Sequence, residues 1–197
     1  SYAAQTTLTQ LPELQDGGQL VYNPDAIYYY GISQGHILGG TYVALSPHLE
    51  RIAFSVGACS FPFMMMRSSN FLQFLGLIEF SLPDTLDQQK FVALIPTLFE
   101  RIDPITYAPY VLQNPLPGSP DRQILMHIGI GDPQVPNEAS HVHARALGMT
   151  HLTPAPRDIP GLPTGAGPFT DESAIVEFDF GLTGELPGDV ATPPEDT

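Results

Sequence analysis

The fold is decided by one stretch, Ala26-Ile27-Tyr28-Tyr29-Tyr30-Gly31-Ile32-Ser33-Gln34-Gly35. Its first half, Ala26 to Tyr30, is apolar and aromatic, as expected of a strand buried on both faces of a parallel sheet. Its second half matches G-x-S-x-G, a sharp turn from strand to helix that lifts a serine hydroxyl above the sheet. Glycines suit this turn because the serine backbone is strained and the strand approaches the helix closely. We therefore expect a strand, a nucleophile at Ser33 and a helix from Gln34 to Leu45.

Strand and helix patterns alternate along the rest of the chain. Three more strands and one more helix are expected, the strands at Arg51 to Gly57, Ile124 to Ile130 and Ile175 to Phe180, and the helix at Glu138 to Leu147. Leucines at helical spacing predict a short helix within Tyr2 to Gln15. Strands separated by helices form parallel sheets with right-handed crossovers. The sequence thus predicts a single α/β domain, with a parallel sheet of about four strands and flanking helices.

A long segment, residues 58–122, interrupts this alternation and is expected to form a helical cap or lid. Within it, Asp84 to Ile102 has a helical pattern with an apolar face. Side chains near its start are candidates for an adaptable apolar pocket, namely Phe61, Phe63, Met64, Met65 and Met66. Packing within the core or the cap is the alternative role for each of them.

Two segments carry a resemblance to a known family. The nucleophile stretch, extended through Gly39-Gly40, resembles the elbow of α/β-hydrolases of the esterase and lipase kind, although His36 stands where a second glycine is common. Ile124-Leu125-Met126-His127-Ile128-Gly129-Ile130-Gly131-Asp132-Pro133 is similar to the strand and loop that present the family's acid. The resemblance implies that residues 1–197 form the carboxy-terminal half of such a domain, with Ser33 as nucleophile and Asp132 as the acid of its triad. The alternative for Asp132 is a solvent-facing turn residue before Pro133.

The resemblance also exposes two gaps. The Gln34 amide is the expected donor to an oxyanion, whereas the second donor would come from strands that precede Ala26 in the family. The family's histidine should follow the last strand, but no histidine occurs after His151. Of the six histidines, we place His36 in a helix, His127 in a strand, His48 and His151 in loops, and we take His141 and His143 as solvated residues of a helix. We therefore expect a fragment whose base lies beyond Thr197, or a pseudo-enzyme.

Composition excludes several classes of partner. The net charge of −14 and the presence of only seven basic residues argue against nucleic acid and anionic membranes. No run is long enough to span a bilayer, Cys59 is alone, and neither observation decides the compartment. No cofactor or metal is expected, because His141 and His143 point to opposite sides of a helix and the acidic residues are dispersed. Residues 182–197 are read as an acidic, proline-rich tail.

The sequence thus predicts a serine hydrolase that cleaves an apolar carboxylic ester through an acyl-enzyme on Ser33, inactive as this isolated chain. The alternative is a non-catalytic binding or scaffold protein with the same fold, and an acidic cation-binding protein is the weakest third class. If strands are missing before Ala26, Ala26 to Tyr30 becomes a sheet edge without lysine or proline to protect it. We expect this edge to pair with the missing amino-terminal segment or with a second copy of the chain.

Overall fold

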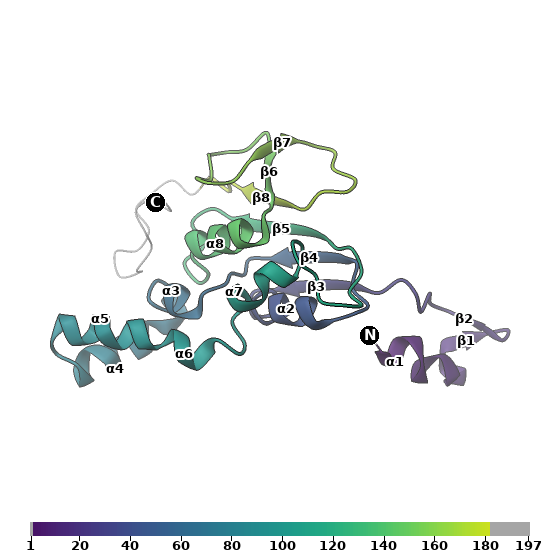
Figure 1. Ribbon diagram of the computed structural model, residues 1–197, viewed down its shortest axis with the longest axis horizontal. Coiled ribbons are helices and arrows are strands. Elements are labelled where there is room, and N and C mark those ends of the chain that lie inside the picture. Colours follow the sequence, from purple (N-terminus) through teal and green to yellow (C-terminus); the bar gives the residue numbers. More distant parts are fainter. Residues whose placement is uncertain (1, 182–197) are drawn as a thin grey trace.

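The computed structural model of the chain describes residues 2–181 and contains one large parallel sheet (Figure 1). The order of its strands is β3-β4-β5-β8-β6-β7, and every neighbouring pair is parallel. The strands are β3 Tyr28–Ile32, β4 Arg51–Ser55, β5 Gln123–Gly129, β6 Thr150–Thr153, β7 Thr164–Ala166 and β8 Ala174–Phe178. Parallel strands joined by helices make this an α/β fold, as expected.

The sheet has six strands rather than about four. The four expected strands occur within one or two residues of their expected positions, and β6 and β7 are the additions. These two strands have four and three residues in a part of the chain that is rich in proline and was interpreted as loop. Strands this short show no readable alternation, so only pairing with a neighbour identifies them.

Helices cover one face of the sheet and fill the long segment between β4 and β5. They are α1 Tyr2–Gln5, α2 Gln34–Leu45, α3 Phe61–Met65, α4 Leu72–Ser81, α5 Thr85–Leu94, α6 Pro96–Phe99, α7 Pro104–Tyr107 and α8 Asn137–Leu147. Two expected helices differ from this. The segment expected as one helix from Tyr2 to Gln15 contains a short helix and two 3₁₀ turns, and the hairpin of β1 Gln15–Asp16 and β2 Gln19–Leu20 follows it. The helix expected from Asp84 to Ile102 is split at Pro96. Pro96 and Pro12 lack the amide that a continuous helix requires.

The main core lies between the sheet and helices α2 and α8. Alternate strand residues on this side, among them Phe54, Met126 and Ile175, pack against Val43 of α2 and Leu147 of α8. The other set of strand residues is open: Tyr28 is 67% exposed and Tyr30 is 61% exposed. The expectation that Ala26 to Tyr30 is buried on both faces was therefore wrong, because nothing within residues 2–181 covers the second face there.

A cavity of about 600 Å³ hollows this second face. It lies over the amino-terminal halves of β3, β4 and β5 and is closed on one side by the loop before β8. Its walls are mainly apolar and aromatic and include Tyr28, Tyr30, Leu125, Pro168 and Phe169, with Arg51 and Glu172 as charged members.

The segment between β4 and β5 projects from one end of the sheet as helices α4, α5 and α6, whereas α1 and the β1–β2 hairpin lie at the other end (Figure 1). The two ends of the segment between β4 and β5 are joined by the buried Asp103 carboxylate. This carboxylate accepts hydrogen bonds from the backbone N–H groups of Ser60 and Phe61 at 2.8 and 2.6 Å. The apolar face expected on Asp84 to Ile102 is exposed to solvent. None of the described helices is long and apolar enough to cross a membrane. The tail expected at 182–197 lies outside the described residues.

Candidate active site

Ser33 occupies a strained backbone position between a strand and a helix. It is the single residue between the end of β3 and the start of α2, and its φ and ψ are 52° and −116°. A positive φ is uncommon for a residue with a side chain and persists only where the surroundings enforce it. Here the Ser33 N–H donates to the carbonyl of Ser55 at 2.9 Å, and its carbonyl accepts the N–H groups of His36 and Ile37. These bonds hold the serine at the tip of the turn.

The two glycines of the motif differ in what they do. A Cβ on Gly31 would lie 2.4 Å from the carbonyl oxygen of Gly35, so the strand and the helix touch at this point. A Cβ on Gly35 would meet nothing within 4 Å. The expectation of close approach therefore holds for Gly31 and was wrong for Gly35, which faces open space.

Asp132 lies at the same edge of the sheet as Ser33. It follows the end of β5 by three residues, and β4 separates β5 from β3 in the parallel sheet. Its Oδ1 atom accepts the backbone N–H groups of Gln134 and Val135 at 2.8 and 3.1 Å. Within residues 2–181 its other oxygen, Oδ2, makes no hydrogen bond. The carboxylate is thus held by one atom and presents the other, as a group that orients a histidine must.

Positive φ angles gather at this edge. Ser33 follows β3, Val56 follows β4, and Gly131 follows β5 by two residues, with φ values of 52°, 41° and 77°. Functional groups of open parallel sheets lie at the carboxyl ends of the strands. Gln34, the expected oxyanion donor, is the first residue of α2, so its N–H is among those without an acceptor inside the helix.

Four of the expected pocket residues lie on α3 and Met66 directly follows it, beside the turn that carries Asp132. Met64 is only 2% exposed and packs with Ile37 of α2 and with Val135 of the turn that carries Asp132, called the acid turn below. Phe61 and Phe63 are partly buried and pack against this cluster. The hydroxyl of Ser68 donates to the carbonyl of Gln134 at 2.5 Å, which fixes this segment to the turn. Met65 and Met66 are half-buried. None of the five lines the 600 Å³ cavity, which lies away from Ser33 and Asp132.

No histidine in residues 2–181 bonds to the Ser33 hydroxyl. His36 instead pairs with His143, with 3.1 Å between His36 Nε2 and His143 Nδ1, and it stacks on Phe54 with 4.3 Å between ring centroids. Both are fully buried. Burial lowers the pKa of His143 to about 3, and burial followed by the neighbouring His143 lowers the pKa of His36 well below 6.5. Each is therefore a neutral core residue.

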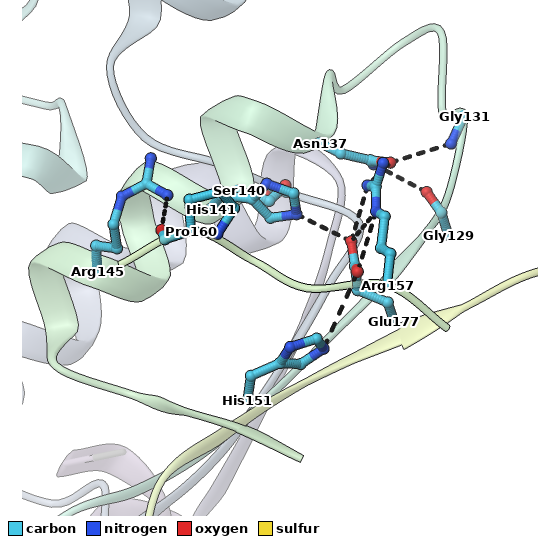
Figure 2. Close-up of polar contacts among 11 residues, drawn as sticks. Gly129, Gly131, Asn137, Ser140, His141, Arg145, His151, Arg157, Pro160 and Glu177 are labelled. Atoms are coloured by element: carbon cyan, nitrogen blue, oxygen red, sulfur yellow. Dashed lines mark hydrogen bonds and ion pairs between the residues drawn. The ribbon is translucent and has the colours of Figure 1, made fainter. Parts of the chain in front are cut away.

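The other histidines correct three further expectations. His143 and His141 are buried rather than solvated, and His151 is a buried residue of β6 rather than a loop residue. Although the acidic residues were judged dispersed, one of them meets His141, whose Nε2 lies 2.9 Å from Glu177 Oε1 (Figure 2). In the sequence, the feature that could have predicted this partner is Glu177 itself, a charged residue inside the largely apolar strand expected at Ile175 to Phe180. His127 lies in β5, as expected.

Glu177 is the centre of a buried polar cluster. Its side chain is fully buried, and Arg157 NH2 lies 2.9 Å from its Oε1 atom (Figure 2). Burial opposes its charge, but hydrogen bonds from His141 and Arg157 outweigh burial and lower the pKa of Glu177 to about 2. Among the described residues, no group of three or more histidine, cysteine and acidic side chains is placed to hold a metal ion.

Comparison with known proteins adds no relative to this geometry. No protein-family model matches the chain, and no curated protein matches it either. The assignment of a function therefore depends on the arrangement of the residues alone.

Proposed function

We propose that this chain is the nucleophile-bearing and acid-bearing part of a serine hydrolase, similar to the carboxy-terminal half of an α/β-hydrolase. The observation that carries the proposal is the backbone of Ser33, a serine with φ of 52° placed alone between a parallel strand and a helix. Strain of this kind costs on the order of 1–3 kcal/mol and gathers at functional sites.

The reaction would be an acyl transfer. A base takes the proton from Ser33 Oγ, which attacks the ester carbonyl carbon, and the N–H of Gln34 donates to the oxyanion that forms. Collapse of this tetrahedral intermediate expels the alcohol, which takes the proton back from the base and leaves an acyl group on Ser33. Water then repeats the sequence and releases the acid. Asp132 accepts the second N–H of the base through Oδ2 and stabilises the cation.

In this proposal the base is a histidine from outside residues 2–181, because none of the six histidines of the chain bonds to the Ser33 hydroxyl. The isolated chain is then a preformed nucleophile and acid without a base. An apolar acyl group suits the site, since α3 brings Phe61 and Phe63 to the acid turn.

The open edge of β3 supports a polypeptide partner. Tyr28 and Tyr30 are exposed on an edge strand that has no protective lysine or proline, and the 600 Å³ cavity begins at the same two residues. A further strand beside β3 would satisfy its free backbone groups and cover these rings. We propose that a separate segment of polypeptide or a second copy of the chain supplies it.

Covalent labelling of Ser33 tests the proposed function. The native protein should react with a fluorophosphonate at Ser33, and the isolated chain should react only when imidazole is added as an external base. Mass spectrometry after digestion identifies the labelled residue. Ser33→Ala should abolish labelling, whereas Ser60→Ala, at another serine with positive φ, should not. Native protein that stays unlabelled would rule the proposal out.

A non-catalytic binding protein is the second candidate, and the apolar cavity on the open face favours it. A binding protein would hold an apolar ligand there whether or not Ser33 is present. Fluorescence titration with a fatty acid probe, on wild type, Ser33→Ala and Leu125→Glu, separates the two. Binding lost only in Leu125→Glu, together with unlabelled Ser33 in the native protein, would favour this second function.

A further inference from the structure

A chain of buried polar contacts runs from β8 to the turn that carries Asp132. It begins at Glu177, whose carboxylate is held by His141 Nε2 at 2.9 Å and lies 4.0 Å from His151 Nε2. Arg157 closes the cluster, with Nε 3.1 Å from Glu177 Oε2 and NH2 2.9 Å from Oε1. A planar guanidinium bonded to both oxygens fixes its own orientation as well as its charge.

The same guanidinium reaches a second residue. Arg157 NH2 also donates to Asn137 Oδ1 at 3.1 Å, so one nitrogen joins the carboxylate on β8 to the first residue of α8 (Figure 2). Asn137 is fully buried. Its amide is therefore fixed in one orientation by an arginine that is itself fixed by Glu177.

Asn137 in turn holds the backbone on both sides of Ile130. Its Nδ2 donates to the carbonyl of Gly129 at 2.9 Å, and its Oδ1 accepts the N–H of Gly131 at 3.0 Å. Gly129 ends β5, and Gly131, with φ of 77°, directly precedes Asp132. The asparagine thus sets the direction in which the chain leaves the strand and enters the acid turn.

We propose that Asn137 and Arg157 are positioning residues for Asp132, acting as a clamp that is anchored on the buried Glu177. The proposal rests on the proposed function, because it concerns the acid of that same site. The only hydrogen bonds of the Asp132 side chain within residues 2–181 are to its own turn, at Gln134 and Val135. These bonds shape the turn but do not attach it to the sheet. The clamp attaches it, and so places Oδ2 relative to Ser33.

The test uses the 197-residue chain, with imidazole as external base and a fluorophosphonate as probe. The variants are Asn137→Ala and Arg157→Lys, and the matched control is Arg145→Gln, because Arg145 donates to the carbonyl of Pro160 outside the clamp. Lysine keeps the charge beside Glu177 but lacks the planar fork with which Arg157 bonds both carboxylate oxygens while its NH2 group reaches Asn137. Hydrogen exchange of the Gly131 amide is measured on the same samples.

In Asn137→Ala we expect the imidazole-dependent labelling rate to fall about tenfold and the Gly131 amide to exchange at least tenfold faster. Arg157→Lys should show a smaller change in both, and Arg145→Gln none. The decisive comparison is made in an Asp132→Asn background, where Asn137→Ala should cost nothing further, since a residue that acts through Asp132 has no effect once that carboxylate is gone.

Equal losses in both backgrounds, or an unchanged Gly131 amide, would overturn the clamp even if labelling proceeds. Absence of labelling in the native protein would instead refute the proposed function, and Gly131 exchange in the variants would still show whether the clamp holds the turn. If Asn137→Ala fails to fold, Arg157→Lys gives the same comparison.

Discussion

The buried pair His36 and His143 should make the chain sensitive to mild acid. Burial lowers the pKa of His143 from 6.5 to about 3 in the folded state, whereas the unfolded chain keeps the ordinary value. Below pH 6.5 the unfolded state therefore binds a proton that the folded state refuses. Each pH unit then removes about 1.4 kcal/mol of stability, or about 3 kcal/mol between pH 6.5 and pH 4.5 from His143 alone.

The perturbation is His143→Asn, which keeps a polar atom near the position of Nδ1 and cannot titrate. The free energy of unfolding is measured with urea at pH 7.0, 6.0, 5.0 and 4.5 at constant ionic strength. We expect the variant to be less stable at pH 7.0 but to lose about 1.4 kcal/mol less per pH unit below pH 6 than wild type.

Titration of Glu177 does not contribute to the pH dependence measured between pH 7.0 and 4.5. Its folded pKa is about 2 against 4.5 in the unfolded chain, so its contribution is present above pH 4.5 and is lost as the pH falls through 2. Burial, the larger cause of the lowered pKa of His36, acts in wild type and variant alike. Identical slopes in wild type and His143→Asn would show that this histidine is not kept neutral by burial, and the reasoning would be wrong.

Two further predictions concern the elbow and the edge strand. Gly31→Ala should lower the free energy of unfolding by about 1–3 kcal/mol in urea, because its Cβ would overlap the Gly35 carbonyl, while Gly35→Ala should be neutral or stabilising; equal effects would refute the close approach. Tyr28→Lys should reduce self-association of the chain in sedimentation velocity, because lysine protects an open edge. A wild-type chain that is already monomeric at every concentration would rule out a second copy as the partner of β3.

The parts of the fold that could be predicted are those whose signal is contiguous in the chain. Helix α2 was placed at its observed bounds because the elbow motif marks its start and Ser46-Pro47 marks its end. Strands β4 and β5 were placed within two residues because their apolar residues lie close together in the chain. Strands β6 and β7 escaped prediction, since three or four residues with threonine and glycine carry no period. The burial of Ala26 to Tyr30 was misjudged, because an apolar run in the sequence does not show whether another part of the molecule covers each face of the strand.

What the sequence by itself determined is the elbow. Gly31, Ser33 and the start of α2 are adjacent in the chain. The close approach of strand and helix at this turn requires a glycine, so the motif itself shows it. Only the tertiary structure decided which polar groups meet. His36 and His143 lie 107 residues apart, and His141 and Glu177 lie 36 apart, so each residue taken alone resembles an ordinary helix or strand residue. Their pairing depends on how α2, α8 and β8 stack on the sheet, because a buried polar group finds its partner only once packing has excluded water.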